Sequence, residues 1–138
     1  MFNGNYEGIF KKCKTIAVYG MSANSEKPSH RVPMFLMSKG YNIIPVNPNA
    51  QQIAGKESHS SLQTIEEDID IVEVFRPSKE ALDIVKMAVD RKRKRGDIKV
   101  IWLQSGIIND EAEKLATSAG IIFIQNRCMY TEYIKSCN

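Results

Sequence analysis

The sequence predicts an α/β protein with a Rossmann-like, three-layer fold built on a five-stranded parallel sheet. Short apolar runs rich in β-branched residues alternate with helical patterns of about ten residues or more. The runs are apolar without interruption, as in residues 121–124, which is typical of strands covered on both faces. A chain of 138 residues has the usual size of one domain with one core, so we expect residues 1–138 to form a single domain.

Five segments share this apolar, β-rich character and are predicted as the strands. They are residues 15–19, 41–46, 71–75, 99–103 and 121–125. Numbered along the chain, the strands are expected in the order 3-2-1-4-5. Right-handed crossovers between parallel strands nearly determine this topology once the first strand is central.

Helices are predicted before, between and after these strands. An amphipathic segment spans about residues 6–12, and a helix begins near His30. Apolar residues at helical spacing predict a further helix through residues 81–89. The segment 109–119 begins with Asn-Asp-Glu, a cap followed by acidic residues, and ends before a glycine. A short helix from near Thr131 is expected to close the chain.

The composition excludes several classes of protein. With 43% hydrophobic and 25% charged residues it is typical of globular domains. No apolar run approaches the roughly 20 residues that span a bilayer, and the first residues lack the pattern of a signal peptide. Cys13, Cys128 and Cys137 show neither Cys-x-x-Cys spacing nor neighbouring histidines, so no disulfide framework or metal site is predicted. We expect a cytoplasmic protein with no membrane partner.

The net charge of +3 comes from one basic run, residues 91–95. Over the rest of the chain the acidic residues are in excess. The simpler interpretation is a solvated helix end, where cations favour the negative end of the helix dipole; a polyanion patch is the alternative. The run lacks interleaved aromatic residues and a helix-turn-helix pattern, so nucleic-acid binding is not expected.

The loop after the first strand is the first candidate for ligand binding. In doubly wound sheets, ligands lie outside the carboxyl ends of the strands, where the strand order reverses. Gly20 permits a tight turn, and Ser22 and Ser29 offer hydroxyl groups. The start of the next helix presents free N–H groups that suit a phosphate. Basic side chains in this segment are Lys27, His30 and Arg31. Since the loop has one glycine where dinucleotide sites have three, an ordinary strand-to-helix turn is the alternative.

The second strand ends in Asn47 and Pro48 and carries no acidic residue at its tip. An NAD site normally has an acid there, which binds the ribose diol. An acid would repel a ribose that carries a 3′-phosphate. The second strand therefore favours a phosphorylated ribose over NAD, with Asn47 as a neutral donor.

The next two strand ends add polar groups at the same edge of the sheet. The third strand is followed by Arg76, which we expect to meet an anionic ligand; pairing with a carboxylate elsewhere in the fold is the alternative. The fourth strand is followed by Gln104 and Gly106. Together these strand ends predict a cleft for an anionic nucleotide.

These segments resemble the small stand-alone CoA-binding domain family. The matching segments are residues 18–22, 27–32, 40–41, 44–48, 55–56, 70–76, 102–106 and 127–128. The family is similar to the CoA-binding domain of the succinyl-CoA synthetase α subunit and of NDP-forming acyl-CoA synthetases. The resemblance runs in order over about residues 14–133. Asn126 departs from the pattern, because the family usually has aspartate before Arg-Cys.

The resemblance implies that coenzyme A or acyl-CoA lies across the strand ends of a Rossmann-like fold. Its phosphates would meet residues 20–22 and 27–31, its nucleotide end would lie near residues 47–48, and its pantetheine arm would run towards Phe75, Arg76 and Gln104. The candidate binding residues are Gly20, Met21, Ser22, Lys27, Ser29, His30, Arg31, Val32, Asn47, Pro48, Phe75, Arg76, Gln104 and Gly106.

The resemblance and the residues together favour a binding module without catalytic residues. The alternative is a subunit of a CoA-dependent enzyme, similar to an acyl-CoA synthetase, that acts with a partner. Those relatives use a phosphorylatable histidine and a nucleotide-binding fold from further domains. Cys128 is interpreted either as a small buried residue or as a thiol near the CoA sulfur. A protein partner and a homodimer both stay open.

Overall fold

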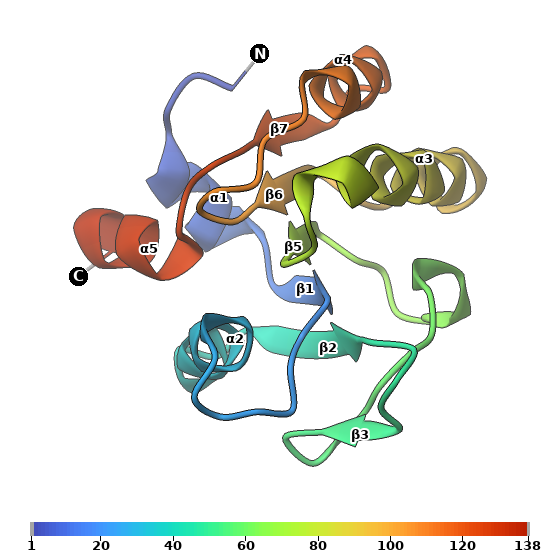
Figure 1. Ribbon diagram of the computed structural model, residues 1–138. Helices are drawn as coiled ribbons and strands as arrows, with labels where there is room; N and C mark the ends of the chain where they lie inside the picture. The colour runs from blue at the N-terminus through green and yellow to red at the C-terminus, as the bar shows by residue number, and fades with distance from the viewer. Residues whose placement is uncertain (1, 138) are drawn as a thin grey trace.

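The computed structural model describes residues 2–137, which form an α/β fold with helices on both faces of a parallel sheet (Figure 1). The main strands are β1 (Thr15–Tyr19), β2 (Asn42–Val46), β5 (Ile71–Val74), β6 (Val100–Leu103) and β7 (Ile122–Ile124). The helices are α1 (Tyr6–Lys12), α2 (Pro28–Ser38), α3 (Ser78–Arg95), α4 (Asp110–Ser118) and α5 (Met129–Cys137). The connection from β2 to β5 holds the hairpin β3 (Gln52–Ile53) and β4 (Lys56–Glu57) and the 3-10 helix η1 (Leu62–Thr64).

The helix ends follow local signals in the sequence. The Asn109 side chain accepts a hydrogen bond from the Ala112 N–H (2.9 Å) and caps α4, as expected. Helix α2 begins at Pro28, slightly before the predicted start, because proline is tolerated in the first turn. No side chain caps this end of α2 within the described residues. Pro28 has no N–H and the His30 N–H donates to the Lys27 carbonyl (2.9 Å), so the Ser29 N–H is the one in this turn that stays available for a ligand.

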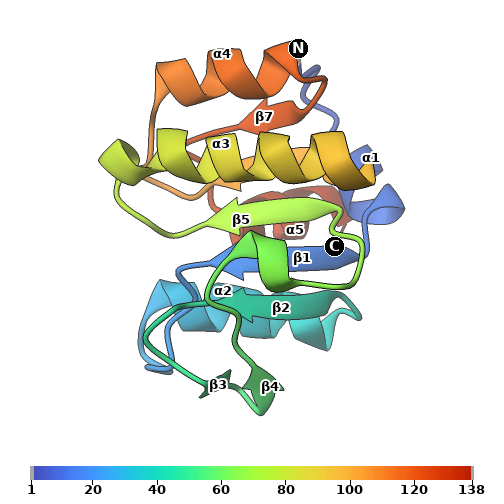
Figure 2. The ribbon, with the colours of Figure 1, turned by 90° about the vertical axis from the view of Figure 1, so that its right-hand side faces the viewer.

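The sheet has the order β2-β1-β5-β6-β7, and all neighbouring strands run parallel (Figure 2). The α/β class and the five-stranded parallel sheet are confirmed. The order needs one correction: in chain order it is 2-1-3-4-5, since the third long strand, β5, pairs with β1 instead of β2.

This placement of β5 follows from the face on which the chain leaves β2. Helix α2 covers one face of the sheet, whereas Leu62 and Ile65 of the β2–β5 connection pack on the other face, with α3. A right-handed crossover on that second face carries the chain back past β1. The strand order therefore reverses between β1 and β5, and their carboxyl ends form the switch point at which ligands bind in such sheets.

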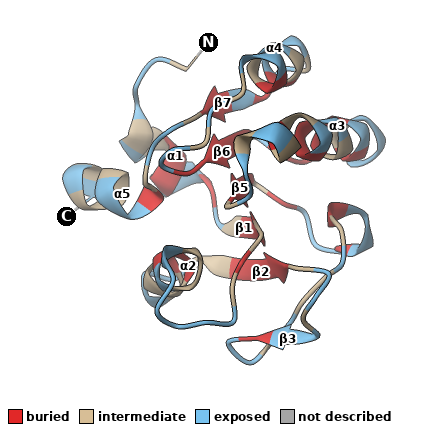
Figure 3. Ribbon diagram, viewed as in Figure 1, coloured by how far each residue is buried: buried red, intermediate tan, exposed pale blue. Residues whose placement is uncertain are grey.

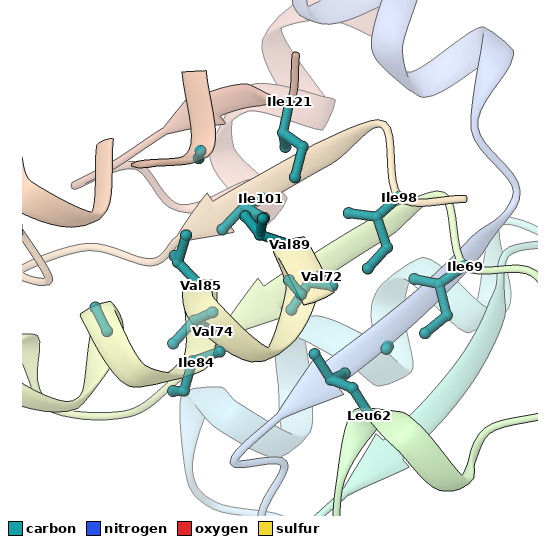
Figure 4. Packing of buried hydrophobic residues seen from close by; sticks show 14 of the residues in the cluster. Leu62, Ile69, Val72, Val74, Ile84, Val85, Val89, Ile98, Ile101 and Ile121 are labelled. Carbon is teal, nitrogen blue, oxygen red and sulfur yellow. The ribbon is translucent and has the colours of Figure 1, made fainter. Parts of the chain in front are cut away.

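Two apolar clusters hold the layers together, one on each face of the sheet. One cluster joins the sheet to α3, α4 and η1 (Figure 4). The other joins it to α1, α2 and α5 and contains Trp102, which is fully buried. Colouring by burial shows the strands mostly red between these helices (Figure 3). The sheet is thus covered on both faces, as the uninterrupted apolar runs predict.

The basic run at the end of α3 is partly built into the fold. Arg91 is buried, donates hydrogen bonds to the backbone carbonyls of Leu62 (2.6 Å), Ile65 (2.8 Å) and Glu67 (2.7 Å), and pairs with Asp97 (3.0 Å). The prediction of a solvated helix end is therefore wrong for this residue. Its guanidinium ties the β2–β5 connection to α3, and this use also removes one charge from the alternative polyanion patch.

Within residues 2–137, no helix has both the length and the apolar character that crossing a membrane requires.

Candidate functional site

The turn after β1 and the turn after β5 meet at the switch point. Gly20 has a φ of +89°, a conformation that favours glycine, and its N–H donates to the Val46 carbonyl (2.8 Å). A Cβ at Gly20 would lie 2.8 Å from Cδ of Arg76 and 3.1 Å from the Phe75 carbonyl oxygen. Glycine is thus required here both by backbone conformation and by the close approach of the β5 end.

A cavity of about 330 Å³ opens between the ends of β1, β2 and β5. The predicted site residues that line it are Gly20, Ser22, Lys27, Ser29, Asn47, Pro48, Phe75 and Arg76. Four further lining residues were not predicted: Tyr19, Val46, Asn49 and Glu80. The three segments singled out from the sequence therefore come together in one place.

Residues 22–29 form one wall of the cavity, and hydrogen bonds hold them in a folded turn. The Ser22 N–H donates to the Ser29 carbonyl (3.3 Å), and the Ser22 hydroxyl accepts from the Asn24 N–H (3.0 Å). Nδ1 of His30 lies 2.7 Å from the Ser22 carbonyl oxygen. These bonds place the open N-terminus of α2 beside the cavity and leave Lys27, an exposed residue, at its rim.

Asn47 joins the β1 and β2 loops. Its side-chain N–H donates to the Met21 carbonyl (3.0 Å), and its side-chain oxygen accepts from the Asn49 N–H (2.9 Å). An amide can make both bonds at once, because it is donor and acceptor. The neutral residue at the tip of β2 therefore shapes the cavity wall and brings no negative charge to it.

Arg76 and Glu80 form the charged wall of the cavity. Nε and Nη2 of Arg76 donate to the two carboxylate oxygens of Glu80 (3.0 and 2.9 Å), so the pair is bidentate. The alternative interpretation of Arg76 as a partner of a carboxylate is thus realised in the structure. The Arg76 hydrogen bond lowers the pKa of Glu80, whereas desolvation raises the pKa of Tyr19 beside them.

Glu80 was not predicted as a site residue, because it lies within α3 and the prediction considered only the strand ends. The relevant signal was its position four residues after Arg76, a spacing that brings side chains together once residue 76 is held at the helix start. Among the residues that line the cavity, Glu80 is the one carboxylate, and Lys27 and Arg76 are the cations. The cavity therefore carries a net positive charge.

Six predicted site residues lie outside the cavity lining. Met21 and Val32 are buried in the apolar cluster under α2, and Arg31 donates from Nη1 to the Glu26 carbonyl (2.8 Å). His30 supports the Ser22 turn. The other two are Gln104 and Gly106. These two follow β6, one strand beyond the switch point, because β5 stands between β1 and β6.

A second set of polar contacts lies at the ends of β6 and β7. The Gln104 side-chain oxygen accepts from the Met129 N–H (2.8 Å) at the start of α5. The Asn126 side-chain oxygen accepts from the Gly106 N–H (2.7 Å), with Asn126 itself at a φ of +57°. An amide oxygen here makes a bond that a carboxylate oxygen would also make, so the departure from aspartate leaves this contact possible.

Fold and cavity together define a doubly wound α/β protein with a positively charged pocket at its switch point. The sequence adds the family: residues 14–134 match the family described as "CoA binding domain", and the chain belongs to that family.

The chain is also similar to a relative and to a solved structure over nearly its whole length. The chain is 35% identical over 121 residues to "Uncharacterized protein YneT" of Bacillus subtilis, covering 88% of this chain and 86% of that protein. It is similar to a solved "hypothetical protein" of Pyrococcus horikoshii OT3, with a TM-score of 0.92, 30% identity, and coverage of 100% and 94%.

A more distant likeness extends to an enzyme. The chain is similar to a "dinucleotide forming Acetyl-coenzyme A synthetase 1" of Ca. Korarchaeum cryptofilum, with a TM-score of 0.70 and 21% identity. The match covers 82% of this chain but 26% of the synthetase. At this identity, the likeness shows a shared fold.

Proposed function

We propose that this protein binds coenzyme A or an acyl-CoA at the switch-point cavity and acts as a binding module without chemistry of its own. The cavity between β1, β2 and β5 is the observation that carries the proposal. It combines a turn that needs glycine, the open end of α2 and two cationic side chains, Lys27 and Arg76. Each of these features suits phosphate groups.

The cavity also supports a preference for a phosphorylated ribose. The β2 tip offers the amide of Asn47 and no acid, and Lys27 and Arg76 bring positive charge to the same cavity. A volume of about 330 Å³ is at the lower end for a ligand site, so it suits the phosphate-bearing part of coenzyme A. The pantetheine arm then leaves over Phe75 towards β6.

Thermal denaturation with four ligands tests the proposal. We expect coenzyme A to raise Tm most, followed by dephospho-CoA, with NAD and ATP weaker. Ligand at 100 times its Kd adds about 2.7 kcal/mol, which corresponds to a shift of several degrees. Equal shifts with coenzyme A and dephospho-CoA would contradict the role given to the ribose phosphate. No response to coenzyme A would refute the proposal.

Two single substitutions locate the site. Lys27→Ala and Arg76→Ala should each weaken coenzyme A binding, with a smaller dependence on salt than in the wild type. Lys79→Ala is the matched control, because Lys79 is exposed on α3 next to Glu80 but does not line the cavity. Turnover of an acyl-CoA by the purified chain would favour the enzyme alternative.

A further inference from the structure

Cys128 occupies a polar setting that its two fellow cysteines lack. It lies half-buried at the start of α5, whereas Cys13 is buried and Cys137 is exposed. Desolvation raises the pKa of the Cys128 thiol, but hydrogen bonds from the Thr131 and Tyr130 N–H groups and from the Gln104 and Thr131 side chains lower it below its usual value. In contrast, burial raises the pKa of Cys13 to about 11. Thiolate is therefore most available at residue 128.

A buried carboxyl group with no hydrogen-bond partner within residues 2–137 lies near this thiol. Glu73 is on β5 and pairs in register with Trp102 on β6, whose Nε1 donates to the Arg127 carbonyl (2.8 Å). The chain at residue 127 thus contacts Trp102, the strand neighbour of Glu73. Both Glu73 carboxyl oxygens are buried and have no hydrogen-bond partner within the described residues. Burial, with a further contribution from Cys128, raises the pKa of Glu73 to about 8.

An unpartnered carboxyl group of this kind calls for an explanation, because buried polar groups are normally hydrogen-bonded. The protein interior around Glu73 is apolar, with Val18 and Trp102 as its strand neighbours. Besides burial, the neighbouring group that raises its pKa is Cys128 at the start of α5. A neutral carboxyl group there leaves the thiolate unopposed by a second negative charge.

The edge of the sheet brings this place close to the cavity. Phe75 lines the cavity, and Phe75 and Gln104 both follow the register pair Val74–Leu103 on adjacent strands. Adjacent strands lie about 4.8 Å apart, so the two residues are neighbours at the sheet edge. Gln104 in turn holds the start of α5. A chain leaving the cavity over Phe75 therefore reaches Gln104 and then Cys128.

We propose that Cys128 is a thiol–disulfide exchange site for coenzyme A, an inference that rests on the proposed function. The Cys128 thiolate attacks the S–S bond of CoA disulfide. A new S–S bond forms between Cys128 and one CoA, the original S–S bond breaks, and the second CoA leaves as a thiolate that takes a proton from water. One disulfide is consumed and one is made, so no further oxidant is needed.

Intact-mass spectrometry with CoA disulfide tests this inference on the full chain. The reduced protein is freed of reductant and incubated, under exclusion of air, with CoA disulfide or with glutathione disulfide. We expect one CoA per chain, mapped to Cys128, at a rate at least about tenfold above that of glutathionylation, because the bound nucleotide holds the disulfide near the thiolate. Cys128→Ser should abolish the adduct, and Cys137→Ser is the matched control that retains it.

Two further measurements separate the inference from the function on which it rests. Calorimetry with reduced coenzyme A should show the same affinity for the wild type and for Cys137→Ser. On the wild type, saturating coenzyme A should slow alkylation of Cys128 by iodoacetamide. Normal coenzyme A binding without an adduct at Cys128, or with the adduct at Cys137, would overturn the exchange site alone. Absence of coenzyme A binding, together with equal rates for the two disulfides, would overturn both.

Discussion

A methyl group placed on Gly20 would come within 2.8 Å of Cδ of Arg76, so the β1 turn and the β5 end are fitted to each other without spare room. The Phe75 carbonyl oxygen, at 3.1 Å, closes the same space from the backbone side. The turn after β1 and the turn after β5 are therefore in direct contact at the cavity, although β2 and the β3–β4 hairpin lie between them in the sequence.

Gly20→Ala should lower both stability and coenzyme A affinity. A residue with a Cβ at a φ of +89° costs about 1–2 kcal/mol, and the added methyl group displaces Arg76. Gly40→Ala is the matched control, because Gly40 has a φ of +97° but open space around its Cβ position. Urea unfolding should show a loss of stability for both variants, larger for Gly20→Ala because its methyl group also meets Arg76 and the Phe75 carbonyl oxygen. Calorimetry should show weaker binding for Gly20→Ala alone. Equal affinities would argue against a ligand at this turn.

Glu80→Gln should strengthen coenzyme A binding roughly threefold or more at low salt, since it removes the carboxylate that offsets Arg76 in the cavity. The gain should shrink as salt is added. Calorimetry at two ionic strengths measures the effect, with Glu132→Gln on α5, outside the cavity lining, as the control. Weaker binding by Glu80→Gln would instead mean that Glu80 positions the Arg76 guanidinium for the ligand.

Arg91→Met should destabilise the protein by about 3–5 kcal/mol, because it removes the nearer of the two cations that pair with the buried Asp97 carboxylate and leaves Arg95, whose Nε lies 4.0 Å away. Three backbone carbonyls also lose their donor. Arg93→Met, at an exposed position two residues on, should change stability by less than about 0.5 kcal/mol. Unfolding in guanidinium chloride compares the two variants. Similar small losses of stability would show that the hydrogen bonds and the ion pair of Arg91 contribute little.

Glu73→Gln should flatten the pH dependence of stability. The pKa of Glu73 is raised to about 8 in the folded protein from an ordinary value of 4.5, so the folded state binds a proton that the unfolded state has released. Its contribution is most favourable below pH 4.5, declines as pH rises towards 8, and is lost above it, by several kcal/mol in all. Unfolding between pH 5 and 9 should therefore show a smaller decline for the variant than for the wild type. If the free energy of unfolding of the variant declined with pH as steeply as that of the wild type, Glu73 would not be the group that holds this proton.

Local signals were sufficient for the elements but not for the sheet order. The cap at Asn109 and the apolar runs are properties of adjacent residues, and the predicted helices and strands agree with the structure to within a few residues. The position of β5 depends on which face Leu62 and Ile65 cover, and this follows from packing against α3. Periodicity along the chain carries no information on that choice.

The candidate site, too, was predicted in part from local signals and was otherwise decided by the strand order. The sequence pointed to the turn at Gly20 and to the ends of β2 and β5, and the cavity joins all three. It also pointed to Gln104 and Gly106, which the assumed strand order placed next to β1. Because β5 lies between them, they form a neighbouring group at the start of α5 instead.

By itself, the sequence determined the α/β class, the strands and helices, and the family to which the chain belongs. The strands and helices depend on interactions between residues that are close in the sequence, and the family is indicated by motifs that occur in a fixed order along the chain. Tertiary structure alone decided that β5 lies beside β1, that Arg76 pairs with Glu80, and that Arg91 is buried against the β2–β5 connection. It also decided that Glu73 is buried near Cys128 with no hydrogen-bond partner among the described residues. The physical reason is that burial and pairing are set by whichever distant segments pack together, and the same side chain is a solvated charge in one arrangement and a buried one in another.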